Sequence, residues 1–97
     1  MDQAMRAYRS VLYIPGSKTR ALDKAKTLPV DAIIFDLEDA VSVDEKLNAR
    51  ALLVETLKTA DYGPRARLVR VNGMDTEWGT GDLAALAGLD IDAVLLP

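Results

Sequence analysis

The feature that most constrains the fold is the alternation of short apolar runs with longer stretches of helical periodicity. The apolar runs cover residues 11–15 (VLYIP), 32–39 (AIIFDLED), 67–72 (RLVRVN) and 93–97 (AVLLP). Gly, Pro or Asp residues bound them, as is usual for strands. Runs with so little polar alternation are typical of strands in parallel sheets, which are covered on both faces. Together with the stretches between them, they predict the order βαβαβαβ.

The three intervening stretches carry signals for where each helix begins and ends. The first, residues 17–28, has Ser17 as the expected N-cap and an apolar face made of Ala21, Leu22, Ala25 and Leu28. The second begins with SVDE, a capping box in which Ser42 and Glu45 would bond to each other's backbone. The third follows NGMDT, carries Trp78, Leu83 and Leu86, and ends near Gly88.

This order favours a right-handed parallel α/β arrangement, which is either an open doubly wound sheet or part of a (β/α)8 barrel. Four strands do not close a barrel, whose usual size is about 250 residues. The sequence also stops at Pro97, at the end of an apolar run with no helix after it. We therefore expect residues 1–97 to form a single incomplete domain, the N-terminal half of a TIM barrel. Its parallel strands should lie in the order 1-2-3-4, with helices only on the outer side.

Composition limits the chemistry that is available. The 97 residues include no Cys and no His, which excludes a disulfide framework, a cysteine nucleophile, common zinc clusters and an imidazole base. Twelve basic and 15 acidic residues give a net charge of −3, so neither nucleic acid nor an anionic membrane is an expected partner. No run approaches the roughly 18 apolar residues of a membrane span. The opening residues lack the long apolar core of a leader, so a cytoplasmic location is expected.

Acidic and basic side chains come late in two neighbouring apolar runs. In an extended strand, Asp36 and Glu38 share a face with Ile34, and Arg70 shares a face with Leu68 and Asn72. Functional groups of parallel α/β proteins gather at the carboxyl edge of the sheet. The pattern therefore predicts a site at this edge, where Arg70 can meet the acids.

Each candidate also has a purely structural interpretation. Asp36 and Glu38 could pair with Arg70 or cap a loop, and Asp39 could be a turn or capping residue. The cations Lys18, Arg20 and Lys24 could form a solvated helix face. The segment PGSKTR alternatively places cations and free amides where an anion such as phosphate would bind. Tyr13 and Trp78 could be packing residues.

Four stretches together carry a resemblance to a known family. They are RSVLYIPGSKTRALDKA, DAIIFDLEDAVSVDEKLNAR, VRVNGMDTEWGTGDL and DAVLLP. In order and spacing they resemble the N-terminal half of the citrate lyase beta-subunit-like (CitE-like) family, which includes malyl-CoA and β-methylmalyl-CoA lyases. The resemblance runs from Arg9 to Pro97, and its details are more similar to the malyl-CoA lyase branch than to the citrate lyase subunit.

The resemblance implies a TIM-barrel carbon–carbon lyase. Such an enzyme uses Mg²⁺ to cleave or form a 3-hydroxyacyl-CoA of the malyl-CoA, β-methylmalyl-CoA or citramalyl-CoA type, with an α-keto acid and an acyl-CoA as the other side of the reaction. It assigns catalysis and substrate binding to Arg70. It also implies that Tyr13 contacts the substrate. The cations Lys18, Arg20 and Lys24 would contact the coenzyme A part. Glu38 and Asp39, with Asp36, would lie near the metal.

The same resemblance implies that the site is shared with residues outside this sequence. The family's direct metal ligands, a Glu and an Asp, lie on later strands, so Mg²⁺ ligands are expected beyond residue 97 and this chain alone is expected to be inactive. The full-length protein is expected to form a homo-oligomer, a trimer or hexamer. One alternative is a short half-barrel that acts as a binding or structural module without activity. Another, an open-sheet nucleotide binder, lacks the Gly-x-Gly-x-x-Gly turn.

Overall fold

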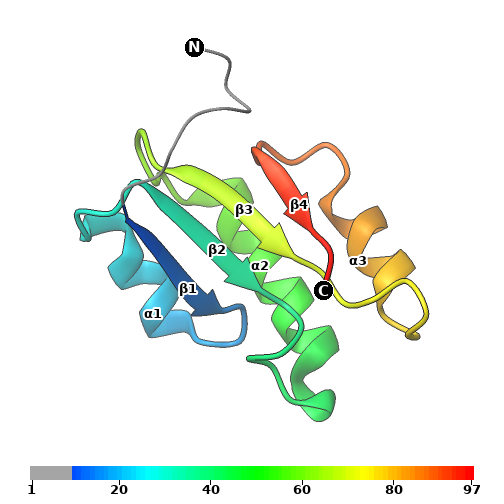
Figure 1. The fold of residues 1–97 in the computed structure, drawn as a ribbon. Helices are drawn as coiled ribbons and strands as arrows, with labels where there is room; N and C mark the ends of the chain where they lie inside the picture. Colours follow the sequence, from blue (N-terminus) through cyan, green and yellow to red (C-terminus); the bar gives the residue numbers. More distant parts are fainter. Residues whose placement is uncertain (1–9) are drawn as a thin grey trace.

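The chain forms one parallel sheet of four strands in the order β1-β2-β3-β4 (Figure 1). A computed structural model describes residues 10–97, and the opening nine residues, including Arg9 and most of the stretch examined for a leader, lie outside the described part. The strands are β1 (Val11–Pro15), β2 (Ala32–Asp36), β3 (Ala66–Arg70) and β4 (Ala93–Leu95). The predicted order and parallel direction are confirmed.

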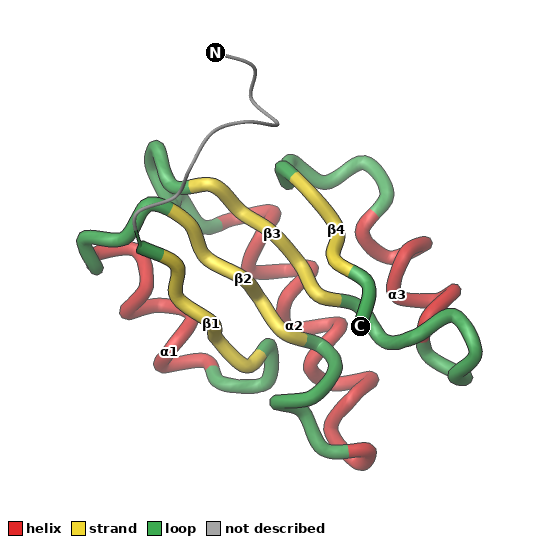
Figure 2. The backbone as a smooth tube through the Cα atoms, viewed as in Figure 1, coloured by secondary structure: helices red, strands yellow, loops and turns green. Residues whose placement is uncertain are grey.

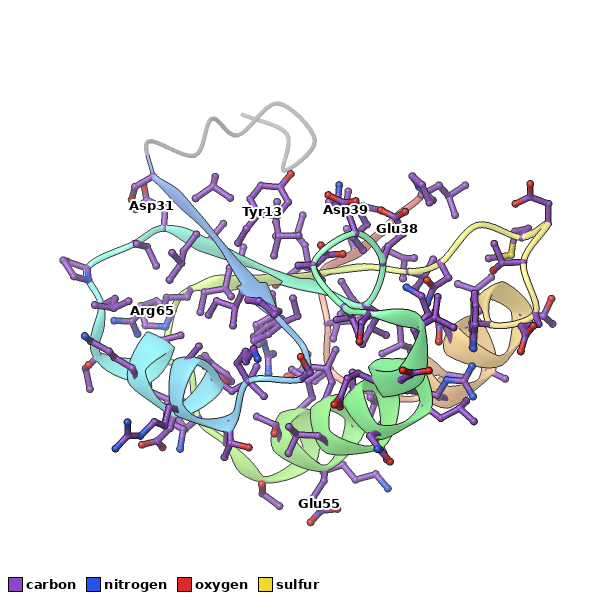
Figure 3. The ribbon with its side chains drawn as sticks, turned by 90° about the horizontal axis from the view of Figure 1, so that it is seen from below. Tyr13, Asp31, Glu38, Asp39, Glu55 and Arg65 are labelled. Carbon is purple, nitrogen blue, oxygen red and sulfur yellow. The ribbon has the colours of Figure 1, made fainter. Side chains whose placement is uncertain are left out.

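The helices cover one face of the sheet. They are α1 (Thr19–Lys24), α2 (Lys46–Thr59) and α3 (Gly79–Leu86), with short 3-10 turns η2 (Ala25–Thr27) and η3 (Val43–Glu45). In Figures 1 and 2 they lie behind the strands, and the turned view of Figure 3 places them together on one side. The expectation of helices on a single side is therefore confirmed for the described residues.

The core lies between the sheet and these helices. Alternate strand residues point toward the helices, so Ile33 and Phe35 of β2 are fully buried against Leu22 of α1 and Leu53 of α2. Tyr62, in the loop after α2, packs edge-on against the ring of Phe35, and the two ring centres are 5.3 Å apart. Its hydroxyl donates to the carbonyl of Leu22 at 2.7 Å, which ties α1 to the loop.

Both predicted helix caps are wrong. Lys18, and not Ser17, occupies the N-cap of α1, and no side chain bonds to the free amides there. Ser42 stands at the N-cap of η3, but only its backbone carbonyl is used, accepting from the amide of Glu45 at 3.0 Å. The chain makes a 3-10 turn before α2, so the helix begins at Lys46, and Leu47 is exposed.

Three strands end earlier than the apolar pattern predicts, and β4 is one of them, because it ends at Leu95. β2 stops at Asp36 and β3 stops at Arg70, so Glu38, Asp39 and Asn72 lie in loops at the carboxyl edge. All strands point the same way, and Figure 2 shows the loops after β1, β2 and β3 at the same edge of the sheet. That edge is where the predicted site residues should meet. Within residues 10–97, no helix has the length and apolar character needed to cross a membrane.

Candidate functional site at the carboxyl edge of the sheet

An ion pair between Arg70 and Asp36 joins the ends of β3 and β2. The two residues are register partners in adjacent strands. Nε of Arg70 donates to Oδ1 of Asp36 at 3.0 Å, and Nη2 donates to Oδ2 at 2.7 Å. Such a two-bond geometry fixes the plane of the guanidinium as well as its position. The predicted meeting of Arg70 with an acid is confirmed, and Asp36 is that acid.

Asp36 is held as a carboxylate although it is almost completely buried. Burial alone raises the pKa of Asp36, because it disfavours the charged form. The hydrogen bonds from Arg70 and from the amides of Glu38 and Ala40, at 2.8 and 3.0 Å, outweigh burial and hold the pKa below its ordinary value. Asp36 therefore has both structural roles considered for it: it pairs with Arg70 and it caps the loop after β2.

The Arg70 guanidinium keeps unused donors. The hydrogen bond to Asp36 raises the pKa of Arg70, so the group is permanently charged. A guanidinium has five N–H donors, and the hydrogen bonds of the described residues use one on Nε and one on Nη2. Its central carbon lies 5.5 Å from the centre of the Tyr13 ring, a cation–π distance. Arg70 thus reaches across β2 toward β1 and still offers Nη1 to a ligand oxygen.

Glu38 and Asp39 lie beside this pair. An oxygen of Glu38 is 3.8 Å from Nε of Arg70, which is an ion pair without a hydrogen bond. Figure 3 shows the side chains of Tyr13, Glu38 and Asp39 on the side of the sheet that faces away from the helices. Asp39 is exposed, and within residues 10–97 its carboxylate takes part in no hydrogen bond, so the predicted capping role is performed by Asp36 instead.

The three predicted cations of the first helix are exposed: Lys18, Arg20 and Lys24. Lys24 lies with Tyr13 around a hollow of about 260 Å³ beside β1, whose other lining residues are apolar or Pro15. Tyr13 thus lies both at this hollow and beside Arg70, while no contact joins Lys24 to Arg70 in the described residues. The structure also does not bring Lys18 or Arg20 into contact with Arg70.

Carboxylates that could bind a metal are few at this edge. The residues that the structure describes contain no group of three or more His, Cys, Asp or Glu side chains able to hold a metal ion. Both oxygens of Asp36 are occupied by Arg70 and by loop amides. Glu38 and Asp39 are thus the carboxylates of this edge that still have oxygens available to a ligand.

Sequence reasoning missed the residues that hold the loops. Lys46 is buried and Trp78 packs over its ammonium at 5.3 Å, which agrees with a packing role for Trp78. Asp82 of α3 accepts from Nε of Arg50 at 2.9 Å and from the side-chain amide of Asn72 at 2.7 Å. One signal was available: Lys46 lies on the same helical stripe as the buried Ala49, Leu53 and Leu57, where a lysine is unexpected.

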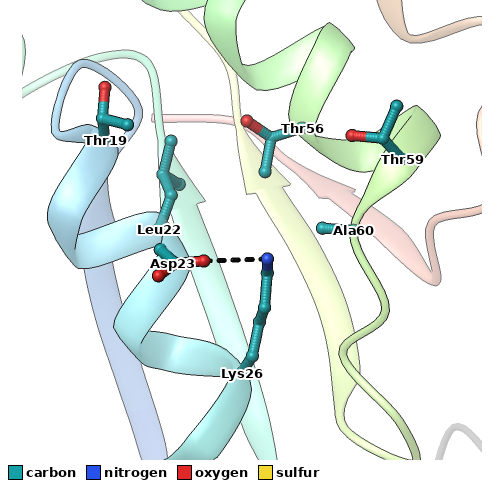
Figure 4. A pocket seen from close by; sticks show the side chains of 7 residues that line it. All are labelled: Thr19, Leu22, Asp23, Lys26, Thr56, Thr59 and Ala60. Atoms are coloured by element: carbon teal, nitrogen blue, oxygen red, sulfur yellow. Dashed lines mark hydrogen bonds and ion pairs between the residues drawn. The ribbon is translucent and has the colours of Figure 1, made fainter.

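A second hollow, of about 140 Å³, lies between α1 and α2 and away from this edge (Figure 4). Its ion pair, between Lys26 and Asp23 at 2.9 Å, is exposed. The hydroxyls of Thr56 and Thr59 donate to carbonyls of their own helix. None of the predicted site residues lines it, so the carboxyl edge is the better candidate site.

A protein-family model described as HpcH/HpaI aldolase/citrate lyase matches residues 9–97. A (3S)-malyl-CoA thioesterase of Cereibacter sphaeroides is 69% identical over 93% of this chain and 32% of its own length. The citrate lyase beta subunit of Leuconostoc mesenteroides is 41% identical over 95% of this chain and 30% of its own length. The chain thus spans about a third of the length of these relatives.

Solved structures agree with the fold. CitE of Mycobacterium tuberculosis, crystallised with magnesium, acetoacetate and coenzyme A, is 34% identical and superposes with a TM-score of 0.78 over 96% of this chain and 33% of that chain. RipC of Yersinia pestis is 32% identical and has a TM-score of 0.64 over 92% of this chain and 34% of that chain. The strand order and the sequence similarity therefore lead to the same group of proteins.

Proposed function

The chain belongs to the HpcH/HpaI aldolase/citrate lyase family, and we propose that it forms part of the substrate site of a Mg²⁺-dependent enzyme acting on a 3-hydroxyacyl-CoA of the malyl-CoA type. The observation that carries this proposal is the Arg70 guanidinium. Asp36 fixes it at the carboxyl edge while its Nη1 stays available. The relatives that are named for malyl-CoA and citrate lyase support the substrate class.

Arg70 would donate to an oxygen that gains negative charge during the reaction. A fixed donor of this kind needs little reorganisation as the charge develops, which is why it favours the transition state. Asp36 keeps the guanidinium in one plane, and Tyr13 flanks it. In this proposal Arg70 is the catalytic and substrate-binding residue, and Tyr13 contacts the substrate.

Glu38 and Asp39 fit a hard metal ion in type but not in number. Mg²⁺ is commonly bound by one or two carboxylates together with water and substrate oxygens. These two side chains would contribute through water or directly, and the remaining protein ligands are expected beyond residue 97. When bound, Mg²⁺ would polarise a carbonyl oxygen of the substrate. CitE of M. tuberculosis, crystallised with magnesium, supports this cofactor.

The exposed cations of α1 and the loop before it suit the phosphates of coenzyme A. Lys24 shares a hollow with Tyr13, and Tyr13 contacts Arg70. In this proposal the substrate would place its acyl end near Arg70 and its phosphates near the predicted cations. Lys18 lies in the loop after β1, at the carboxyl edge, and Arg20 lies in the first turn of α1, so both could attract the phosphates by their charge.

Two reactions can start from that complex. In carbon–carbon cleavage, the C3 hydroxyl of malyl-CoA loses its proton and becomes the carbonyl of glyoxylate as the bond between C2 and C3 breaks. The electron pair of that bond remains on C2 beside the thioester, and protonation of C2 gives acetyl-CoA. In hydrolysis, water adds to the thioester carbon and the C–S bond breaks, giving malate and free coenzyme A. The family description favours the first, and the 69% identical thioesterase favours the second.

Product analysis separates these reactions. The full-length protein is incubated with malyl-CoA and Mg²⁺, and free thiol and glyoxylate are measured in parallel. Glyoxylate without thiol identifies a lyase, whereas thiol without glyoxylate identifies a thioesterase. Neither product, together with no retention on immobilised coenzyme A, would reject the proposal and favour the binding or structural module.

A further inference from the structure

We propose that Lys46 is a positioning residue that locks the loop after β2 and joins it to the loop after β3. Lys46 is the first residue of α2, and its side chain is buried. Its ammonium donates to three carbonyl oxygens of that loop: Glu38 at 2.8 Å, Val41 at 3.1 Å and Leu37 at 3.3 Å. An ammonium has three N–H donors, so this cage of carbonyls can satisfy all of them.

Asp36 holds the same loop through its amides. Its two carboxylate oxygens accept from the N–H groups of Glu38 and Ala40. The loop backbone is thus fixed by an anion at its donors and by a cation at its acceptors. Glu38 and Asp39, whose carboxylates accept no hydrogen bond within the described residues, lie between these two anchors. A loop held in this way can present its side chains as rigidly as a strand does.

Lys46 also contacts the next loop along the sheet edge. The Trp78 ring covers its ammonium, and the carbonyl of Trp78 accepts from Nη2 of Arg50 at 3.0 Å. Arg50 in turn is paired with Asp82, which holds the backbone and side-chain amides of Asn72. These contacts form a continuous chain from the loop after β2 to the end of β3.

The chemistry of lysine suits this place. A methionine would fill a similar volume but would take the ammonium donor away from three carbonyl oxygens, and an unsatisfied buried acceptor is destabilising. The carbonyl of Glu38 would keep the amide of Val41, at 3.3 Å, as a donor. An arginine would keep the charge over Trp78, but its planar fork does not match three acceptors that converge on one point. The matched control is Lys58→Met, because Lys58 lies on the same helix and is exposed.

The structural part of this proposal is measured without any substrate. We expect Lys46→Met to raise hydrogen exchange of the amides between Leu37 and Val41 by at least about tenfold, which corresponds to losing about one net hydrogen bond. The emission of Trp78, the single tryptophan of this sequence, should shift as well. Lys46→Arg should keep the Trp78 emission and lose the loop protection, whereas Lys58→Met should change neither.

The functional part rests on the proposed Mg²⁺ site. Since the loop carries Glu38 and Asp39, loosening it should weaken the apparent affinity for Mg²⁺ about 10–100-fold, the usual effect of removing a residue that orients metal ligands. The KM for the acyl-CoA should change much less. A full-length wild-type protein without malyl-CoA turnover would reject the proposed function, while the exchange and fluorescence results would still decide the role of Lys46.

A measurement on the unmodified protein covers the case in which Lys46→Met does not fold. A caged ammonium exchanges its protons slowly with water, so the Lys46 side chain should give a protected ammonium signal in nitrogen NMR, and Lys58 should not. Absence of a protected signal, or wild-type exchange and emission in a folded Lys46→Met protein, would overturn the proposal.

Discussion

At the scale of single residues, Arg70 combines a structural and a chemical role. Two of its donors hold Asp36, and Nη1 remains for a ligand. The ion pair was one of the structural interpretations of the sequence, but it does not compete with catalysis. A guanidinium without Asp36 would rotate freely, whereas the pair fixes the direction of its remaining donors.

Replacing Arg70 should therefore affect turnover more than binding. We expect Arg70→Ala in the active enzyme to lower kcat by roughly 10²-fold or more, the scale of losing one oxyanion donor. Arg70→Lys should recover only part, because a point charge cannot keep the planar fork. Lys18→Ala should instead raise KM in a salt-dependent manner. Steady-state kinetics at two ionic strengths measure all three. An Arg70→Ala enzyme with normal kcat and lowered stability would leave Arg70 only its structural role.

Asp36 should make stability depend on pH in the acid range. Its pKa in the folded protein lies below the ordinary value of 3.8. The unfolded chain therefore binds the proton first, and the stabilisation, complete above that value, is lost as pH falls through the folded pKa. Urea unfolding across this range should show the loss in wild type and not in Asp36→Asn. Asp44→Asn, which removes the same charge from an exposed position, controls for net charge. Parallel curves for wild type and Asp36→Asn would contradict the assignment.

At the scale of elements, the start of α3 is anchored to the end of β3 by one buried carboxylate. Asp82 accepts from the backbone and side-chain amides of Asn72 and from Arg50 of α2. A methyl group on Gly79, the first residue of α3, would overlap the carbonyl of Gly73. The helix therefore approaches the loop so closely that only glycine fits there, and Asp82 satisfies the polar groups that this approach buries.

Removing the Asp82 carboxylate should destabilise the fold. We expect Asp82→Ala to lower the free energy of unfolding by about 2–3 kcal/mol, because it leaves buried amide donors and Arg50 without their acceptor. Asp90→Ala is the matched control, since the carboxylate of Asp90 is exposed and its ion pair with Arg67 is worth less than about 1 kcal/mol. Urea unfolding measures the free energy of unfolding of both variants. Equal losses would show that the buried contacts of Asp82 stabilise the fold no more than an exposed ion pair does.

At the scale of the whole molecule, the face of the sheet without helices carries exposed apolar side chains. Val11 and Tyr13 of β1 are 44% and 55% exposed. β1 and β4 each pair with one neighbour in the described sheet, so their outer edges carry free backbone groups. Four strands are half of an eight-stranded barrel, while the residues correspond to about a third of the length of the relatives.

We expect the 97-residue chain by itself to self-associate through this face and these edges. Val11→Lys places a charge on the edge strand and should reduce association. Val43→Lys adds the same charge at an exposed position in η3, outside the sheet, and should not. Sedimentation velocity distinguishes them. A wild-type chain that is a stable, cooperatively folding monomer would contradict this expectation.

The amino-acid sequence by itself determined which segments form strands, the order of the strands and the place of the candidate site. Apolar runs bounded by Gly, Pro and Asp are local signals, and parallel strands bring their carboxyl ends to one edge whatever the loops do. That is why Asp36 and Arg70 could be expected to meet although they lie 34 positions apart. The family could be identified from motifs within the same segments.

Only the tertiary structure decided how the loops are held. Serine is a residue type that commonly caps helices, but the side chains of Ser17 and Ser42 make no capping hydrogen bond in the structure. The preference for a cap is too weak to determine the local backbone against the packing of the whole chain. Lys46 and Asp82 satisfy buried backbone groups whose positions depend on where separate segments come to lie. An unsatisfied polar group is costly when it is buried, so these backbone groups are bonded by side chains that lie close to them in the folded protein. Which side chains lie close depends on the tertiary structure and cannot be read from their spacing along the sequence.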